Sequence, residues 1–194
     1  MPRPRLGAPM TWIETVPAEA ATGRLKQTYE RVGAKRGAVA NIYQAMSLHP
    51  DALAANLELY TSIHFSADSP LSRREREIIA TVVSRANGCA YCVSHHADAL
   101  GRHAKEPGLQ ALVATDHLKA PLTPRERAMA DHADKLTRQP GDVGPADVGA
   151  LRDAGLSDRE ILDITLATAY FNFATRVATG LGVSLEDVDR AYEY

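Results

Sequence analysis

Both cysteines of the chain and two of its seven histidines lie within ten residues, in the stretch NGCAYCVSHH at 87–96. The Asn-Gly pair is expected to end one helix and let the chain turn, which places Cys89 in the first turn of the next helix. Cys92 follows three residues later, so the two sulfurs share a face and can come close enough to form a disulfide. His96 lies four residues beyond Cys92 on that face, where an imidazole can take a thiol proton.

This pattern predicts thiol–disulfide chemistry. The partial positive charge of a helix N-terminus favours a thiolate, and it favours Cys89 because that residue is nearer the helix start. The histidine one turn away favours Cys92 instead. We follow the histidine, because a directed base specifies which proton leaves. His95 points about 100° away from His96 and is not expected to serve the same thiol.

Two other interpretations of the cysteines remain open. Cysteines that form no disulfide are often small buried hydrophobic residues. Cys89, Cys92 and His96 could also supply three ligands to zinc, with His103, Glu77 or a neighbouring subunit as the fourth. Zinc sites of this kind usually show a second ligand pair at regular spacing, and this sequence has none.

Other polar and aromatic residues near this stretch have less specific signals. Glu77 lies off the apolar stripe of its predicted helix, and by itself it is expected to be solvated and paired with Arg73. Tyr91 could donate a hydrogen bond to a peroxide oxygen, which makes it the candidate substrate-binding residue, although packing is the simpler role. Trp12, the only tryptophan, is expected to anchor an N-terminal arm, residues 1–17. The histidines expected to be solvated or satisfied in ordinary helical surroundings are His103, His117 and His132.

The elements that must position these residues are predicted to be helices throughout. Ala, Leu, Glu and Arg dominate the periodic segments, and strand-like alternation is hard to find. Three predicted helix starts carry a capping box, a Ser or Thr followed three residues later by Glu: Ser72 and Glu75, Thr123 and Glu126, Ser157 and Glu160. The predicted helices cover residues 18–33, 39–47, 50–65, 72–86, 88–101, 107–117, 123–138, 145–154, 157–180 and 184–193.

A weak internal repeat relates the segment with the cysteines to a later one. Residues 71–88 match 156–173 without gaps at the cap, along one helix face and at the terminal Asn. The second copy, residues 156–182, lacks the polar set of the first: Glu77, Cys89, Cys92 and His96 correspond to Leu162, Ala174, Val177 and Leu181. These four polar residues are therefore not required by the helix pair as such.

The bulk properties favour one globular domain covering residues 1–194, with a redox core at 71–101. The chain has 194 residues, is 45% hydrophobic and carries a formal net charge of -2 with interspersed signs. No extended basic stripe suits nucleic acid, and no apolar run of about 18 residues suits a membrane. Without an apolar segment of the signal-peptide kind, the expected location is the cytoplasm, where a C-x-x-C pair seldom forms a permanent disulfide.

The set Glu77, Cys89, Cys92 and His96, within EIIATVVSRANGCAYCVSHH, resembles the core of the alkylhydroperoxidase D / carboxymuconolactone decarboxylase family. The upstream PDALAANLELYTSIHF and the chain length resemble its peroxidase-related branch. The resemblance implies an all-α, alkylhydroperoxidase D-like helical bundle that forms homo-oligomers. It also implies a thiol peroxidase or disulfide reductase that needs no haem, flavin or metal cofactor.

The resemblance also implies roles for the residues. Cys92 is the attacking thiol, Cys89 resolves the intermediate, and His96 and Glu77 form a proton relay, which makes Glu77 a buried carboxylate near His96. The reductant is expected to be an external dithiol of the lipoyl or thioredoxin type, and a peroxiredoxin can be a partner. The chain departs from the family pattern at Tyr91, where the well-studied branch has a histidine, so one proton carrier is missing and the reductant stays open.

The sequence therefore predicts an antioxidant hydroperoxide reductase or disulfide oxidoreductase. Three alternatives remain open: a non-redox lyase or decarboxylase-type enzyme that uses His96 as general base, a zinc-binding helical interaction protein, and a redox sensor with the same dithiol.

Overall fold

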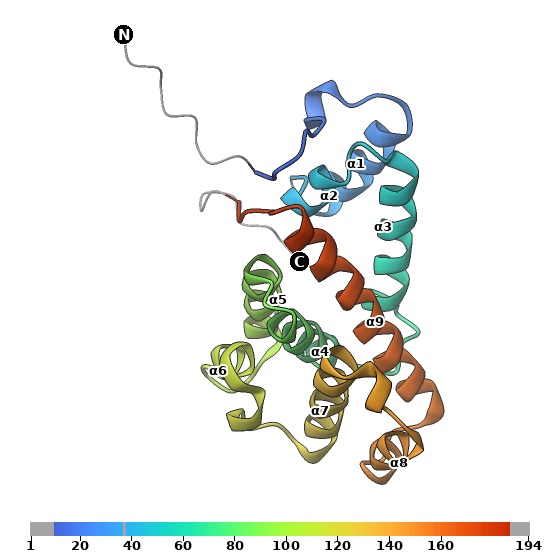
Figure 1. The fold of residues 1–194 in the computed structure, drawn as a ribbon, viewed down its shortest axis with the longest axis vertical. Coiled ribbons are helices and arrows are strands. Elements are labelled where there is room, and N and C mark those ends of the chain that lie inside the picture. Colours follow the sequence, from blue (N-terminus) through green and yellow to red (C-terminus); the bar gives the residue numbers. More distant parts are fainter. Residues whose placement is uncertain (1–9, 37, 187–194) are drawn as a thin grey trace. The chain divides into compact units, whose positions relative to one another are not determined.

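The described part of the chain, residues 10–36 and 38–186 of a computed structural model, is helical and contains no strand, which confirms the all-α prediction. Figure 1 shows the arrangement of its elements. The α-helices are α1 (Gly23–Arg36), α2 (Asn41–Ala45), α3 (Pro50–His64), α4 (Arg73–Ala86), α5 (Ala90–His103), α6 (Leu109–Asp116), α7 (Pro124–Arg138), α8 (Pro145–Asp153) and α9 (Asp158–Gly180). Short 3-10 turns cover Ala18–Ala20, His117–Lys119 and Pro140–Asp142.

The predicted helix boundaries hold to within a few residues except at three places. The predicted helix 18–33 starts with a separate 3-10 turn, and α1 itself begins at Gly23. The predicted helix 88–101 begins at Ala90, because Gly88 has a φ of 67° and Cys89 is the extended residue that caps α5. Most of the predicted helix 184–193 lies outside the described residues.

The three predicted capping boxes are present. At each helix start the Glu carboxylate accepts from the backbone N–H of the cap residue, at 2.7 Å for Ser72, 2.9 Å for Thr123 and 2.7 Å for Ser157. The cap hydroxyl in turn accepts from the backbone N–H of the Glu, at 3.2 to 3.4 Å. The sequence signal was reliable here because a capping box is made by residues three apart in the chain.

Two arginines connect these capping glutamates to one another. Arg125 donates from Nε to Glu75 at 2.7 Å and from Nη2 to Glu160 at 2.6 Å. Arg74 donates from Nε to Glu126 at 2.6 Å. The first turns of α4, α7 and α9 are thereby joined in one network of charge-assisted hydrogen bonds.

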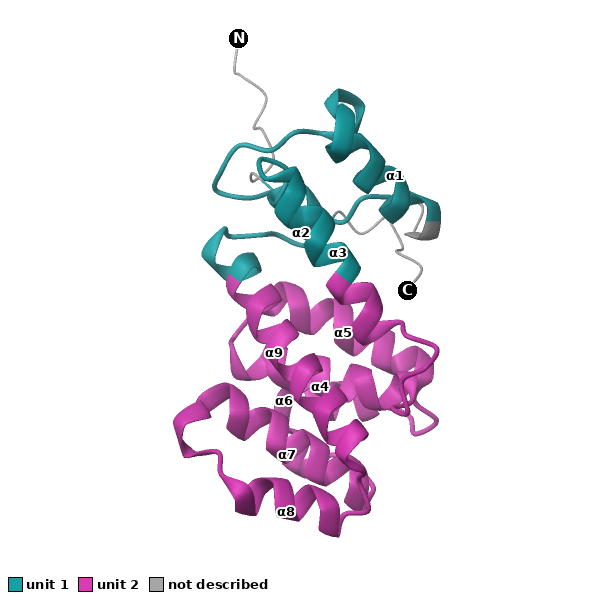
Figure 2. Cartoon of the chain, turned by 90° about the vertical axis from the view of Figure 1, so that its right-hand side faces the viewer, with its two compact units in different colours: residues 1–58, 177–194 teal, residues 59–176 magenta. Residues whose placement is uncertain are grey.

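The chain divides into two compact units, one made of the described parts of Met1–Glu58 and Val177–Tyr194 and the other of Leu59–Arg176 (Figure 2). The second unit has a core around α4, which packs against α5, α6 and α7. Its inner residues Ile78, Ile79, Val82 and Val83 have no exposed surface. The first unit has a smaller core, to which Leu25, Tyr29, Val32, Tyr43 and Leu53 contribute. That the chain folds as one domain stays a prediction of the sequence.

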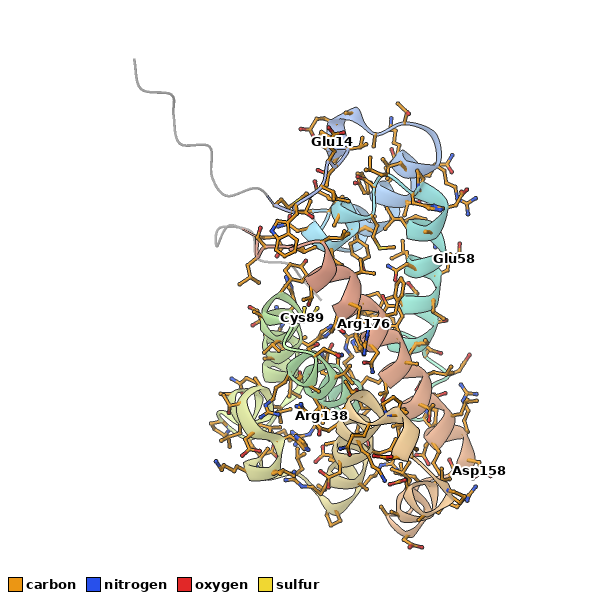
Figure 3. All side chains as sticks on the ribbon, in the orientation of Figure 1. Glu14, Glu58, Cys89, Arg138, Asp158 and Arg176 are labelled. Atoms are coloured by element: carbon orange, nitrogen blue, oxygen red, sulfur yellow. The ribbon has the colours of Figure 1, made fainter. Side chains whose placement is uncertain are left out.

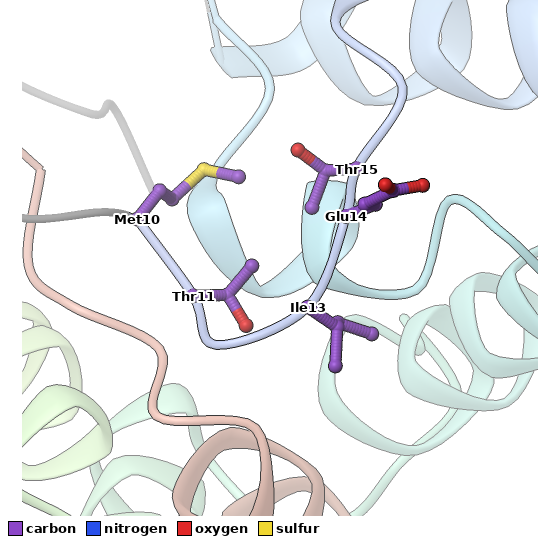
Figure 4. A pocket seen from close by; sticks show the side chains of 5 residues that line it. All are labelled: Met10, Thr11, Ile13, Glu14 and Thr15. Atoms are coloured by element: carbon purple, nitrogen blue, oxygen red, sulfur yellow. The ribbon is translucent and has the colours of Figure 1, made fainter.

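The described part of the N-terminal arm, residues 10–17, makes backbone hydrogen bonds to residues 181–184. Trp12 donates its N–H to the carbonyl of Leu181 at 2.9 Å, and Ser184 donates to the carbonyl of Met10 at 2.9 Å. The indole of Trp12 lies against Gly182, where any Cβ would clash with it, yet 74% of the residue is exposed. Both the backbone and the indole of Trp12 therefore contact the segment at residues 181–184. A pocket of about 370 Å³ opens beside Met10, Thr11, Ile13, Glu14 and Thr15 (Figure 4).

The internal repeat has a structural counterpart in α4 and α9. The matched pairs Ile79 and Ile164, and Val82 and Ala167, are all buried. The second copy is a single unbroken helix, so it keeps the first helix of the motif and lacks the turn. The matched asparagines are hydrogen-bonded: Asn87 donates from Nδ2 to Oδ1 of Asn172 at 3.0 Å.

None of the described helices is long and apolar enough to cross a membrane.

Candidate active site

A fully buried carboxylate, Glu77, is the centre of the site. His96 donates from Nδ1 to Oε2 of Glu77 at 2.8 Å. The other oxygen, Oε1, accepts from Nε2 of His64 at 3.0 Å and from Nε of Arg73 at 2.8 Å. Three elements therefore contribute to this cluster: α3 supplies His64, α4 supplies Glu77 and Arg73, and α5 supplies His96. The prediction that Glu77 is a buried carboxylate near His96 is confirmed.

The cluster fixes the charge of the carboxylate. Burial alone raises the pKa of Glu77, but the attraction and hydrogen bond of His64, followed by those of His96, bring this pKa well below its ordinary value. Arg73 adds a full positive charge, with Nη2 at 2.6 Å from Oε1. Glu77 is therefore an anion at neutral pH, and each imidazole must present an N–H to it.

The ionised Glu77 determines which nitrogen of His96 carries the proton. Nδ1 is bonded to Glu77, so in the neutral ring Nε2 keeps its lone pair and can act as a base. A carboxylate behind an imidazole also stabilises the imidazolium that forms when the ring takes a proton. The side chain of His96 keeps 12% of its surface exposed, while His64 and Glu77 have none.

Aromatic rings enclose the two imidazoles. Tyr60 stacks on His64 with centroids 5.3 Å apart, and Phe171 meets both His64 and His96 edge-on, at 5.1 and 4.7 Å. The guanidinium of Arg73 lies over the ring of Phe65 at 4.1 Å. Water is thereby excluded from one side of the Glu77 cluster, which strengthens the interactions inside it.

The cysteines lie at the start of α5 (Figure 3, where Cys89 is labelled). Cys89 is the cap residue, and its sulfur accepts from the backbone N–H of Cys92 at 3.3 Å. Both residues are reduced and buried, with 2% and 7% of their surface exposed. The short separation along the first turn suits a disulfide between them.

In the reduced form, the helix N-terminus does not dominate the pKa of Cys92. The hydrogen bond to Cys89, and then burial, raise the pKa of the Cys92 thiol. Cys92 therefore keeps its proton, and the Cys89 sulfur is the acceptor in the pair. This geometry agrees with the helix-terminus argument for Cys89, and it leaves the removal of the Cys92 proton to a separate base.

The remaining candidate residues lie away from Glu77. Tyr91 is buried and packs on the ring of His95, with centroids 4.4 Å apart, and its role in substrate binding stays a prediction. His103 is exposed, and His117 is satisfied by Asp131 at 3.1 Å. His132 departs from the prediction: it is buried, its Nδ1 has no hydrogen-bond partner among the described residues, and it lines a pocket of about 430 Å³ between α7 and α8.

Sequence reasoning missed His64. The residue is the second last of the stretch HPDALAANLELYTSIHF, and it follows Leu53, Leu57 and Tyr60 at the spacing of one helix face. A histidine that continues a buried apolar face was the available signal. Arg73 was identified as the partner of Glu77, but this pairing was expected at the surface.

One group among the described residues could hold a metal ion, and it does not include the cysteines. The possible ligand atoms of His64, Glu77 and His96 lie within 4.8 Å of one another. The donor set resembles that of a catalytic zinc site. However, the guanidinium of Arg73 already pairs with Glu77 and supplies the positive charge that a metal ion would bring. The zinc alternative built on Cys89 and Cys92 gains no support from this geometry.

Comparisons with known proteins agree on the fold. The model of the carboxymuconolactone decarboxylase family matches residues 50–135, a range that contains the Glu77 cluster and both cysteines. An uncharacterised peroxidase-related protein of Ralstonia eutropha JMP134, described as an alkylhydroperoxidase AhpD core, has 32% sequence identity and a TM-score of 0.86. The match covers 93% of this chain and 95% of that chain. A peroxidase-related protein of Silicibacter sp. TM1040 has 31% identity and a TM-score of 0.79, with 97% and 95% covered.

A more distant structure shares the fold alone. The debrominase Bmp8 has 20% identity and a TM-score of 0.73, and the match covers 91% of each chain. A comparison with curated protein sequences found no match.

Proposed function

Because this chain belongs to the alkylhydroperoxidase D-like proteins of the carboxymuconolactone decarboxylase family, we propose that it is a thiol-dependent hydroperoxide reductase. The observation that carries the proposal is the buried bond between Glu77 and His96, one helical turn beyond a reduced Cys-x-x-Cys pair. This arrangement supplies a base with a fixed tautomer, and it supplies two thiols close enough to share a disulfide.

In the proposed first step, Nε2 of His96 takes the proton of Cys92. The Cys92 thiolate then attacks the distal oxygen of a hydroperoxide. A sulfur–oxygen bond forms, the oxygen–oxygen bond breaks, and the leaving alkoxide takes the proton back from His96 as an alcohol. Cys92 is then a sulfenic acid. Glu77 stabilises the imidazolium between the two proton transfers.

In the second step, the Cys89 sulfur attacks the sulfur of the sulfenic acid. The disulfide forms, and hydroxide leaves as water with the proton that the Cys89 thiol gives up. An external dithiol, of the lipoyl or thioredoxin type, then reduces the disulfide by exchange and becomes oxidised itself. This cycle needs no cofactor, it suits a reducing cytoplasm, and Tyr91 is the residue proposed to contact the peroxide. A homo-oligomer and the absence of a nucleic-acid partner belong to the same proposal.

The raised pKa of Cys92 has a consequence for this scheme. A protonated thiol reacts slowly with oxidants, so Cys92 becomes nucleophilic only when a base removes its proton. The sulfur that accepts the Cys92 N–H belongs to Cys89, so Cys89 is the alternative attacking thiol. The two assignments differ in which single variant traps a sulfenic acid.

Intact mass with thiol alkylation tests the proposal. The reduced protein is treated with one equivalent of an organic hydroperoxide, and both thiols are expected to become protected with the loss of two hydrogens. Cys89→Ser is expected to stop at a sulfenic acid that dimedone traps, while Cys92→Ser is expected to be inert. The reverse pattern would exchange the two roles, and two fully alkylatable thiols in the wild-type protein would refute the peroxidase.

One observation favours a second candidate. The bond between Glu77 and His96 is complete without either sulfur, so the pair could act as a general base for a non-redox lyase. Turnover of a carbon acid by the double variant Cys89→Ala, Cys92→Ala would support this candidate, and loss of that turnover would remove it.

A further inference from the structure

We infer that His64 is a positioning residue of this site, which holds Glu77 ionised and turned towards His96 so that Nε2 of His96 stays available as the base. The inference rests on the proposed function. The two oxygens of Glu77 are divided between different partners: Oε2 accepts from His96, and Oε1 accepts from His64 and Arg73. With both oxygens bonded, the carboxylate cannot rotate without breaking two or more hydrogen bonds.

His64 is itself held in one orientation. Its side chain has no exposed surface, Tyr60 stacks on one face and Phe171 meets the ring edge-on. Its Nε2 is bonded to Glu77, and its Nδ1 has no hydrogen-bond partner among the described residues. A buried acceptor without a donor is costly, and the arrangement costs least when His64 is neutral with its proton on Nε2.

In this tautomer His64 donates a hydrogen bond to Glu77 and cannot take a proton from it. A proton that reached Glu77 could not pass to Nε2 of His64, because that nitrogen already carries one. The relay therefore ends at Glu77. His64 stabilises the anion at the end of the relay and takes no proton from it.

The titratable groups that face Glu77 come from three helices. Glu77 faces His64 on α3, His96 on α5, and Arg73 and Arg76 on α4. The α9 helix contributes the uncharged ring of Phe171 to both imidazoles, and its Asp163 acts on Arg76. Burial opposes ionisation of Glu77 most strongly, and the hydrogen bonds of His64 and His96, together with the nearby charge of Arg73, favour it.

Loss of the anion would switch the tautomer of His96. A protonated Glu77 would donate its O–H to Nδ1, the ring proton would move to Nε2, and no lone pair would remain for the thiol. Removing His64 is therefore expected to act on the pH dependence of thiol reactivity more than on substrate binding.

The test compares His64→Phe, which removes the donor and keeps an aromatic ring, with His64→Gln, whose side-chain amide can still donate to Glu77. The readout is the rate of peroxide-driven thiol loss between pH 5 and 9. In His64→Phe the acid limb is expected to move up by about one pH unit, so that the rate on this limb falls about tenfold. His64→Gln is expected to restore the wild-type limb.

His117→Phe is the matched control. His117 is also buried, bonded through Nε2 to a carboxylate, and without a partner at Nδ1 among the described residues, but its carboxylate is Asp131. The control is expected to lose comparable stability and to keep the wild-type pH profile. Equal profiles for His64→Phe and His117→Phe would overturn the inference and leave the peroxidase proposal standing.

Nitrogen NMR of the histidines in the wild-type protein tests the inference without a substitution. We expect His64 to be neutral with its proton on Nε2, and His96 to carry its proton on Nδ1. A His64 with its proton on Nδ1, or charged near neutral pH, would overturn the inference even if His64→Phe fails to fold. A wild-type protein that peroxide does not oxidise would refute the proposed function, and the NMR result would still decide the role of His64.

Discussion

The stability of the second unit should depend on pH through His64. Burial first, against the opposing attraction and hydrogen bond of Glu77, lowers the pKa of His64 from 6.5 to about 4. A histidine whose pKa is lower in the folded state binds its proton mainly when unfolded. Its contribution to stability is therefore complete above pH 6.5 and is lost as the pH falls towards 4.

The size of this loss follows from the two pKa values. Between pH 7 and pH 5, one group with an unfolded pKa of 6.5 and a folded pKa of about 4 lowers the free energy of unfolding by about 2 kcal/mol. Because His64 has no exposed surface, solvent screening does not reduce this figure. Glu77 also has a lowered pKa, and its own contribution is lost only below its unfolded pKa, at the acid end of the range.

Urea unfolding at pH 7, 6 and 5 measures the effect, in the wild-type protein and in His64→Gln. The buried His132 also has a lowered pKa and destabilises the protein in the same direction, but this contribution cancels in the comparison. The wild-type protein is expected to lose about 2 kcal/mol more than the variant between pH 7 and 5. Parallel losses in the two proteins would show that His64 is charged or solvated in the folded state, contrary to the geometry around it.

Three further predictions concern the relay, the capping network and the open face of α9. Glu77→Gln is expected to slow peroxide-driven thiol loss about 100-fold at pH 7, because the anion behind His96 is gone; an unchanged rate in stopped-flow assays would remove Glu77 from the relay. Arg125→Ala breaks bonds to two capping glutamates, and it is expected to lower the free energy of unfolding by about 1 kcal/mol; urea midpoints equal to those of the wild-type protein would contradict this. If the predicted homo-oligomer uses the exposed apolar residues Leu162 and Leu166 of α9, Leu166→Glu is expected to lower the mass found by light scattering. The control Leu118→Glu, at a leucine that is more exposed than Leu166, is expected to leave it unchanged; equal masses for both variants would place the interface elsewhere.

The parts of this molecule that sequence reasoning predicted well are local. A capping box joins residues three apart, and a helix face repeats every three or four residues, so both are present in the sequence itself. The boundary at Cys89 was wrong by two residues, because the left-handed backbone at Gly88 delays the start of α5. That small error matters for the chemistry, since it changes Cys89 from a first-turn residue into the cap that accepts the Cys92 N–H.

The site itself depends on contacts between distant segments, and these left a weaker signal. The pattern of α4 alone favoured a solvated Glu77, and only the family resemblance pointed to a buried one. His64 lies 13 residues earlier, in a different helix, and its distance from Glu77 is set by how α3 packs on α4. No spacing rule relates those two residues, so a histidine at the end of an apolar face could be noticed but not assigned a partner.

The two copies of the internal repeat show what creates the site. Along one face of α4, Glu77, Thr81 and Ser84 are polar and have no exposed surface. The matched face of α9 has the apolar Leu162, Leu166 and Ala169 in their places, and all three are exposed. Both faces belong to helices, and the difference lies in what packs on them. His64 from α3 and His96 from α5 lie against the face of α4, and each bonds to Glu77. A buried carboxylate is stable only with such partners, so Glu77 and the two histidines that pack on it depend on each other. Placing a glutamate at Leu162 would therefore add a solvated charge to α9 and would not create a second site.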